Sequence, residues 1–189
     1  DSSNAYAGVG GIRELLVGVL VEPSMMLALF VAALATGTTN IGEMGLMVGS
    51  LAAGSPVAVV VAAAAFAIAC YVELGKLPYD MAEAEQEIQE GPLAEYSGPS
   101  LALVKMSMSM KQVLVVSWFV AVFLPFGSAA ELTLAVGALV YLVKVAAIFF
   151  VCSFVENLVA RVRYKLMGRQ TWTVVGVSVL AFVFCVLGV

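Results

Sequence analysis

Residues 132–155 read LTLAVGALVYLVKVAAIFFVCSFV and contain a single charged side chain, Lys144. A run of about 20 apolar residues is long enough to cross the hydrocarbon core of a bilayer as an α-helix. Scanning the rest of the chain for runs of this kind gives four more candidates. The five predicted spans are residues 15–36, 46–72, 106–126, 132–155 and 172–189. The sequence therefore predicts an all-α fold, a polytopic transmembrane helix bundle.

The composition agrees with a membrane location, because 62% of the 189 residues are hydrophobic and only 12% are charged. Soluble domains contain about 45–50% apolar and about 25% charged residues. Histidine is absent, and Cys70, Cys152 and Cys185 lie in apolar runs without a Cys-x-x-Cys spacing. Cysteines in such surroundings are typical small core residues. We therefore expect this chain to bind no metal and no cofactor of its own.

Basic residues between the last two predicted spans indicate the topology. This connection contains Arg161, Arg163, Lys165 and Arg169. The positive-inside rule places such a connection in the cytoplasm. Counting spans backwards puts residues 73–100 and Arg13 on the same side, with the C-terminus outside. We expect a single membrane domain over residues 1–189, with residues 73–100 as a cytoplasmic acidic loop.

That acidic loop contains residues 73–98, ELGKLPYDMAEAEQEIQEGPLAEYSG, with seven of the chain's thirteen carboxylates. Pro78 suits the first turn of a helix and Gly91-Pro92 a stop, so residues 78–90 are predicted to form a short helix. Its two faces are an apolar row and an acidic row. The apolar row is Leu77, Met81, Ala84 and Ile88, and the acidic row is Asp80, Glu83, Glu87 and Glu90. Either the loop is simply solvated, or the acidic row packs against protein and shares protons cooperatively.

Ionisable residues also occur within the predicted spans. Glu22 lies inside the first span and precedes Pro23, with Arg13 and Glu14 at the cytoplasmic end of that helix. Lys144 is near the centre of the fourth span, and an ionisable group at such depth is costly enough to indicate function. We expect Lys144 to lie near a carboxylate. The candidate partners are Glu22, Glu131 and Glu156.

Lys105 and Lys111 lie toward the cytoplasmic end of the third span. Two interpretations remain open for them, reaching lipid headgroups or taking part in function. Together, the intramembrane charges and the acidic loop are typical of proton handling.

The pattern Glu73-x-x-Lys76-x-Pro78-Tyr79-Asp80-x-x-Glu83-x-Glu85-x-Glu87, followed by Gly91 and Glu95-Tyr96-Ser97-Gly98, resembles a cytoplasmic loop of the complex I subunit 1 (NuoH-like) family. Upstream, Arg13 and Glu22 resemble the family's arginine that precedes an intramembrane glutamate. The family has about eight spans, so the resemblance implies that three N-terminal spans are missing from the five predicted here. The first residue is Asp1 rather than Met, which agrees with a processed chain or a piece of a longer one.

Quinone-reducing members of the family usually have Arg-x-Pro-Phe-Asp-Leu in this loop, whereas this chain has Lys76-Leu-Pro-Tyr-Asp-Met81. The loop is more similar to that of Ech-type and CO-induced (Coo-type) energy-converting [NiFe]-hydrogenases. The resemblance then implies a non-redox subunit of an oxidoreductase complex in the cell membrane, coupling ferredoxin-linked electron transfer to proton or sodium translocation. It implies as partners the hydrogenase large and small subunits, an iron–sulfur subunit and antiporter-like subunits. The NiFe centre and iron–sulfur clusters would lie in those partners.

Two other functions remain open, a subunit of a quinone-reducing complex I and an autonomous secondary transporter. A transporter would be expected to have broken helices around a site in the middle of the membrane, and Pro23 and Lys144 are compatible with that. Twelve residues are predicted to form the proton path or coupling element. They are Arg13, Glu14, Glu22, Glu73, Asp80, Glu83, Glu85, Glu87, Glu90, Glu95, Lys144 and Glu156.

Overall fold

The computed structural model describes residues 5–50, 53–80, 91–127, 133–160 and 164–188, and these residues contain helices and no strand. Five helices are long and apolar enough to cross a membrane, which confirms the predicted polytopic α-helical fold. The elements are α1 (Ala5–Thr36), α2 (Ile41–Gly49), α3 (Pro56–Glu73), the 3₁₀ helix η1 (Gly91–Glu95), α5 (Gly98–Phe123), α6 (Leu134–Leu158) and α7 (Tyr164–Leu187).

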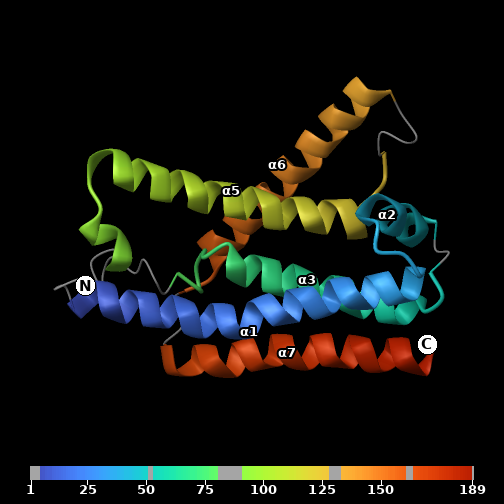
Figure 1. The fold of residues 1–189 in the computed structure, drawn as a ribbon, viewed down its shortest axis with the longest axis horizontal. Helices are drawn as coiled ribbons and strands as arrows, with labels where there is room; N and C mark the ends of the chain where they lie inside the picture. Colours follow the sequence, from blue (N-terminus) through green and yellow to red (C-terminus); the bar gives the residue numbers. More distant parts are fainter. Residues whose placement is uncertain (1–4, 51–52, 81–90, 128–132, 161–163, 189) are drawn as a thin grey trace.

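Three of the long helices, α1, α3 and α7, pack side by side and form the main body of the bundle (Figure 1). Helix α5 lies along one side of this body, and α6 crosses behind α5 and projects away from the other helices. Helix α2 lies near the C-terminus, at the end of the bundle opposite the N-terminus. Since most of α6 is exposed within the described chain, its apolar surface is available to lipid or to another protein.

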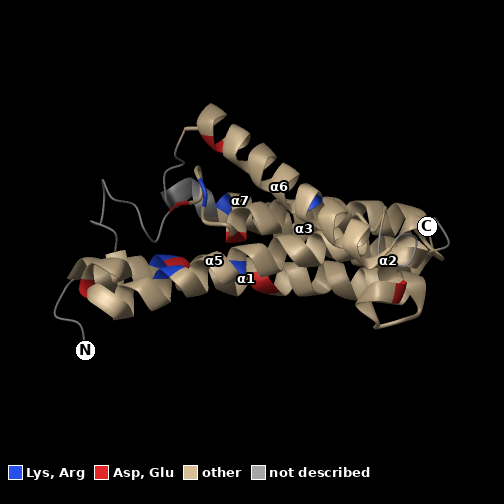
Figure 2. Ribbon diagram, turned by 90° about the horizontal axis from the view of Figure 1, so that it is seen from above, with Lys and Arg blue, Asp and Glu red and all other residues tan. Residues whose placement is uncertain are grey.

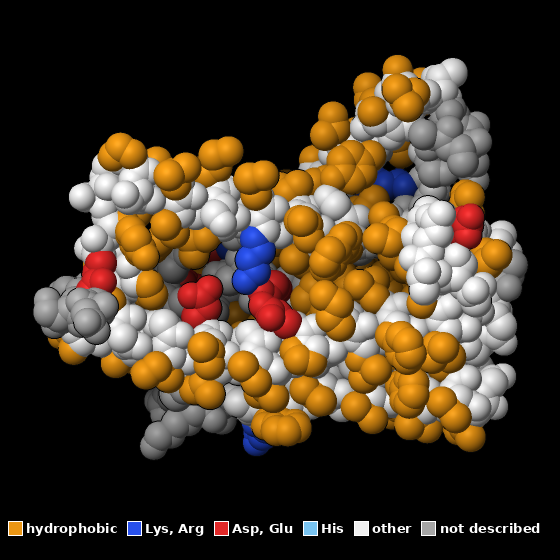
Figure 3. Space-filling model, in the orientation of Figure 1, with side chains coloured by type: hydrophobic (Ala, Val, Ile, Leu, Met, Phe, Trp, Pro, Cys, Tyr) orange, Lys and Arg blue, Asp and Glu red, His pale blue; other side chains and the backbone are white. Residues whose placement is uncertain are grey.

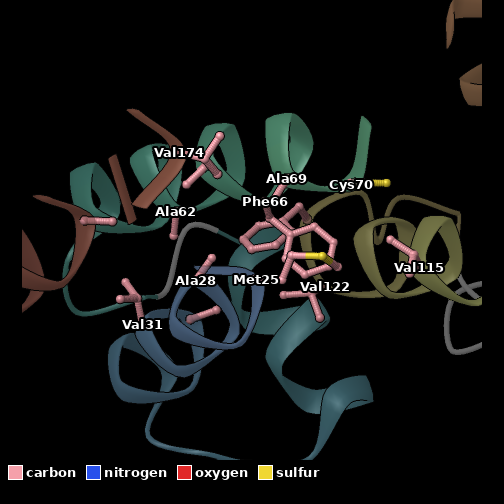
Figure 4. Packing of buried hydrophobic residues seen from close by; sticks show 14 of the residues in the cluster. Met25, Ala28, Val31, Ala62, Phe66, Ala69, Cys70, Val115, Val122 and Val174 are labelled. Atoms are coloured by element: carbon pink, nitrogen blue, oxygen red, sulfur yellow. The ribbon is translucent and has the colours of Figure 1, made fainter. Parts of the chain in front are cut away.

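The buried core extends from α1, α3 and α7 to α5. Met25, Phe66 and Val122 come together in it from α1, α3 and α5 (Figure 4). The ring of Phe66 also packs against the rings of Phe119 and Phe123, with centroids 6.1 and 5.7 Å away. The buried residues of α1 and α3 include many small ones, namely Ala28, Ala32, Ala58, Ala62, Ala65 and Ala69. Small side chains allow two backbones to approach closely, which is how helices commonly associate in membranes.

The predicted second span, residues 46–72, was wrong at its N-terminal end. Helix α2 ends at Gly49, and α3 starts separately at Pro56. A proline in the first turn of a helix loses no hydrogen bond, because the first N–H groups have no partner within the helix. The N–H of Gly54 donates to the carbonyl of Ala35 over 2.8 Å. This bond ties the start of α3 to the end of α1, so the break between α2 and α3 is part of the packing.

Other boundaries also differ from the prediction. Helix α1 starts ten residues before the predicted residue 15, and α5 starts at Gly98 instead of residue 106. Helix α1 has 32 residues, which at 1.5 Å per residue is about 48 Å, well beyond the roughly 30 Å of a hydrocarbon core. Hydropathy locates the apolar part of a helix, and these helices continue past it.

Candidate functional site

A cavity of about 890 Å³ opens between α1, the C-terminal end of α3 with the turn that follows it, and α5. Four carboxylates and two ammonium groups line it, so its formal charge is −2. The acids are Glu14, Glu22, Glu73 and Asp80, and the bases are Lys76 and Lys111. Figure 3 shows acidic and basic side chains gathered in a hollow between α1 and α5. Figure 2 shows that most charged residues lie in the half of the bundle that contains the N-terminus.

Helix α1 contributes Glu14 and Glu22 to the cavity wall. They are eight residues apart, which is about 12 Å along a helix axis. Gly18 lies one turn before Glu22, and a Cβ placed there would touch the Glu22 carboxylate at 3.7 Å. That distance is an ordinary van der Waals contact, so Gly18 lies directly beside the Glu22 carboxylate. Helix α1 continues through Pro23 without a break.

The opposite wall is organised by an ion pair between the Lys111 ammonium of α5 and the Glu73 carboxylate at the end of α3. The Glu73 side chain is only 6% exposed, whereas that of Lys111 is 47% exposed. The neighbouring Gln112 donates from Nε2 to the backbone carbonyl of Leu74 over 2.9 Å. Two consecutive residues of α5 therefore hold the C-terminal end of α3 against the cavity.

Sequence reasoning did not find the Lys111–Glu73 pair. It left Lys111 between a headgroup contact and a functional role, because the two residues are 38 positions apart and no helical spacing connects them. Only the packing of α5 against α3 brings them together.

The segment after α3 is a turn, so the predicted helix does not start at Pro78. The N–H of Tyr79 donates to the Lys76 carbonyl over 2.8 Å, and the Tyr71 hydroxyl donates to the Leu77 carbonyl. The first bond closes a turn over residues 76–79, and the second ties that turn to the end of α3. The rings of Tyr71 and Tyr79 pack edge to face at 6.1 Å. Burial raises the pKa of Tyr79 above its ordinary value, so its hydroxyl stays protonated at neutral pH.

The rest of the predicted acidic helix, residues 81–90, lies outside the described residues, and so do its predicted functional acids. These are Glu83, Glu85, Glu87 and Glu90. The described part of the acidic loop continues with η1, which packs against α1 and buries Leu93. Glu95 is exposed at the end of η1 and does not line the cavity.

Two other predicted residues also lie outside the cavity lining. Arg13 is half-buried on α1, beside the cavity residue Glu14. Glu156 is half-buried near the C-terminal end of α6, and its charge acts on Tyr71 and Cys152. The structure thus lines one cavity with Glu14, Glu22, Glu73 and Asp80, whereas Arg13, Glu95 and Glu156 are not among its lining residues.

Lys144 lies in α6 and donates from Nζ to the backbone carbonyls of Leu124, over 2.6 Å, and Phe126. Those carbonyls follow the C-terminal end of α5, where the helix leaves its last acceptors without intrahelical donors. Lys144 therefore has polar neighbours, as expected for a lysine in the middle of a span. Its pairing with Glu22, Glu131 or Glu156 stays a prediction, and Glu131 lies outside the described residues.

Cysteines and carboxylates do not gather into a metal-binding arrangement in the described ranges. None of those residues forms a group of three or more His, Cys, Asp or Glu side chains that could hold a metal ion. The chemistry available in the cavity is acid–base chemistry, carried by carboxylates, ammonium groups and a tyrosine hydroxyl.

Helices and cavity together define a class, a polytopic membrane protein with ionisable groups gathered between its helices. The family model described as NADH dehydrogenase (NADHdh) matches residues 1–187, and the chain belongs to this family. Hydrogenase-4 component C of Escherichia coli (strain K12) is 48% identical over 100% of this chain and 60% of its own length. Formate hydrogenlyase subunit 4 of the same organism is 40% identical over 97% of this chain and 61% of its own length.

More distant relatives include the NuoH-type subunit of NADH-quinone oxidoreductase from Rickettsia africae (strain ESF-5), 27% identical over 92% of this chain and 52% of its own length. A chain of the membrane-bound sulfane sulfur reductase, an archaeal respiratory membrane complex, has a TM-score of 0.80 and 26% sequence identity. It is matched over 100% of this chain and 62% of its own length. The chain thus spans about three fifths of the length of the two hydrogenase-type relatives. The predicted family is confirmed, with hydrogenase-type members more similar than the quinone oxidoreductase subunit.

Proposed function

We propose that this chain is the membrane subunit that couples electron transfer in a docked redox arm to the translocation of protons or sodium ions. The observation that carries the proposal is the cavity in which carboxylates of α1 and α3 meet the Lys111 ammonium. The Glu73 side chain is nearly buried, whereas Glu14, Glu22 and Lys111 are exposed within the described chain. Charges that share a site influence one another's protonation. A change of charge at one wall of the cavity therefore shifts the protonation equilibrium of the carboxylates on the other wall.

The names of the relatives that are 48% and 40% identical, Hydrogenase-4 component C and Formate hydrogenlyase subunit 4, support a hydrogenase as the redox partner. In this proposal, ferredoxin is the electron donor, and the large, small and iron–sulfur subunits of the hydrogenase hold the NiFe centre and the clusters. Antiporter-like subunits are the neighbours in the membrane. The acidic loop faces the cytoplasm, where it meets the redox arm, and the C-terminus lies outside.

A subunit of a quinone-reducing complex I is the second candidate. The 27% identity to the NuoH-type subunit of NADH-quinone oxidoreductase supports it, and the cavity lining also contains apolar residues such as Leu15, Val19 and Met26. The purified complex distinguishes the two. Bound quinone together with NADH oxidation would favour the second candidate, and ferredoxin-linked hydrogen evolution would favour the first. The third candidate, an autonomous transporter, finds less support because α1 is unbroken at Pro23.

The test of the proposed function is Glu22→Gln in the complete complex. Glutamine keeps the shape of the side chain but cannot exchange a proton, so we expect ion translocation into vesicles to fall at least about tenfold. Subunit content should stay normal, as shown by native mass spectrometry. Glu43→Gln is the matched control, because Glu43 is exposed on α2 and lies outside the cavity lining. Full translocation by an intact Glu22→Gln complex would remove Glu22 from the path.

A further inference from the structure

Lys111 is within electrostatic reach of three carboxylates that come from two helices. It pairs directly with Glu73 of α3, and the charges of Glu14 and Glu22 on α1 also act on its ammonium group. All four side chains line the same cavity. A lysine that merely reached for headgroups would point away from such a cluster. The direction of Lys111 indicates a role inside the cavity.

The two partners of the ion pair differ in freedom. Glu73 is fixed at the end of α3 with its side chain almost completely buried, whereas about half of the Lys111 side chain is exposed. A lysine has a flexible four-carbon stem and a compact charge, so it can change partners by rotating its side chain. A buried carboxylate cannot remain charged cheaply once its cation leaves. Movement of Lys111 and the protonation of Glu73 are therefore linked.

We propose that Lys111 is a positioning residue that exchanges its carboxylate partner between Glu73 on α3 and the acids Glu14 and Glu22 on α1. The inference rests on the proposed function and adds a mechanism to it. When Glu73 takes one proton from the water of the cavity, its charge disappears and the ammonium moves to α1. Lys111 keeps its own proton throughout, and the formal charge of the cavity rises from −2 to −1. Release of the Glu73 proton to water restores the original pair.

Other ionisable groups surround the exchange. Lys76, Tyr79 and Asp80 line the cavity from the turn after α3, and Cys70 lies one turn before Glu73 on α3. Lys76 is the only other cation among the described lining residues, and it belongs to the same segment as Glu73. The Lys111 ammonium of α5 is thus the cation that can pair with acids on both the α3 wall and the α1 wall.

Infrared difference spectroscopy of the purified complex tests the first half of the proposal. In Lys111→Met, Glu73 loses its cation, and we expect the C=O stretching band of one protonated carboxylic acid to appear at pH 7. The band should be absent from the double variant Lys111→Met/Glu73→Gln. It should also be absent from Lys111→Arg, which keeps the charge, and from Lys105→Met, which removes an exposed lysine of the same helix. No new band in Lys111→Met would overturn the proposal.

A thermal cycle on the same complex tests the exchange of partners. In the Glu73→Gln background, Lys111 is expected to pair with α1, so Glu22→Gln should lower the unfolding midpoint by about 3 °C more than it does in the wild type. Adding Lys111→Met should abolish this difference. Equal effects of Glu22→Gln in both backgrounds would contradict the exchange. Neither measurement involves turnover, so each can fail or succeed independently of the ion translocation that tests the proposed function.

Discussion

Two lysines lie within predicted spans of this bundle, and the structure gives them different partners. Lys111 of α5 meets the Glu73 carboxylate at the wall of the cavity. Lys144 of α6 donates to the backbone carbonyls of Leu124 and Phe126, just after the end of α5. A carboxylate can change its charge with pH or with the state of a partner, whereas a backbone carbonyl cannot.

Depth in a span therefore does not by itself identify a residue of the ion path. Lysine satisfies its three donors wherever acceptors are available, and the end of a helix supplies carbonyl acceptors as readily as a glutamate supplies a carboxylate. The bonds from Lys144 to Leu124 and Phe126 hold α6 to the end of α5, and we propose that the bond from Lys111 to Glu73 responds to protonation. The place of Lys144 in the proton path stays a prediction.

Lys144→Met should have the largest effect on stability, because it removes a charged donor from two carbonyls. We expect a loss of about 3 kcal/mol, since hydrogen bonds to charged groups contribute more than neutral ones. Thermal unfolding of the purified complex measures it. Lys144→Arg, which keeps the charge and the donors, should recover most of the loss. An unfolding temperature equal to that of the wild type in Lys144→Met would contradict the structural role that distinguishes Lys144 from Lys111.

Gly45→Val should weaken the junction between α2 and the end of α5, where the Lys144 bonds also lie. A Cβ on Gly45 would clash with the Ala121 carbonyl, and one on Gly49 would lie 2.8 Å from Cγ of Pro125. Pro125 lies between the two residues whose carbonyls Lys144 caps, so overpacking there should cost about 2 kcal/mol. Gly42→Ala is the control, because Gly42 is exposed on the same helix. An unchanged unfolding temperature for Gly45→Val would mean that α2 does not support this junction.

Gln112→Leu should have the smallest effect and should concern only the Lys111 region. It removes the donor to the Leu74 carbonyl, at a cost of about 1 kcal/mol. The infrared spectrum should remain that of the wild type, because the Lys111–Glu73 pair is intact. A new protonated-carboxyl band in this variant would mean that the pair depends on how α5 is held and not on Lys111 alone.

Sequence reasoning found the membrane fold and four of the acids in the cavity, because apolar length and charge in an apolar run are properties of single segments. It selected Glu22 for its position in an apolar run, and Glu73 because it opens the acidic loop and the motif that resembles the family. It missed the break between α2 and α3, which depends on a hydrogen bond from Gly54 to Ala35. It also missed the Lys111–Glu73 pair and the turn at Pro78. These depend on which helices become neighbours, and local periodicity does not contain that information.

If protonation in the cavity drives ion movement, the double variant Glu73→Gln/Lys111→Met should uncouple that movement from electron transfer. The variant removes one negative and one positive charge, so the formal charge of the cavity stays the same. Ions translocated per hydrogen formed are measured in proteoliposomes that contain the assembled complex. The account predicts that hydrogen evolution continues while the ratio of ions to hydrogen falls at least about tenfold. A wild-type ratio in an intact complex would contradict it.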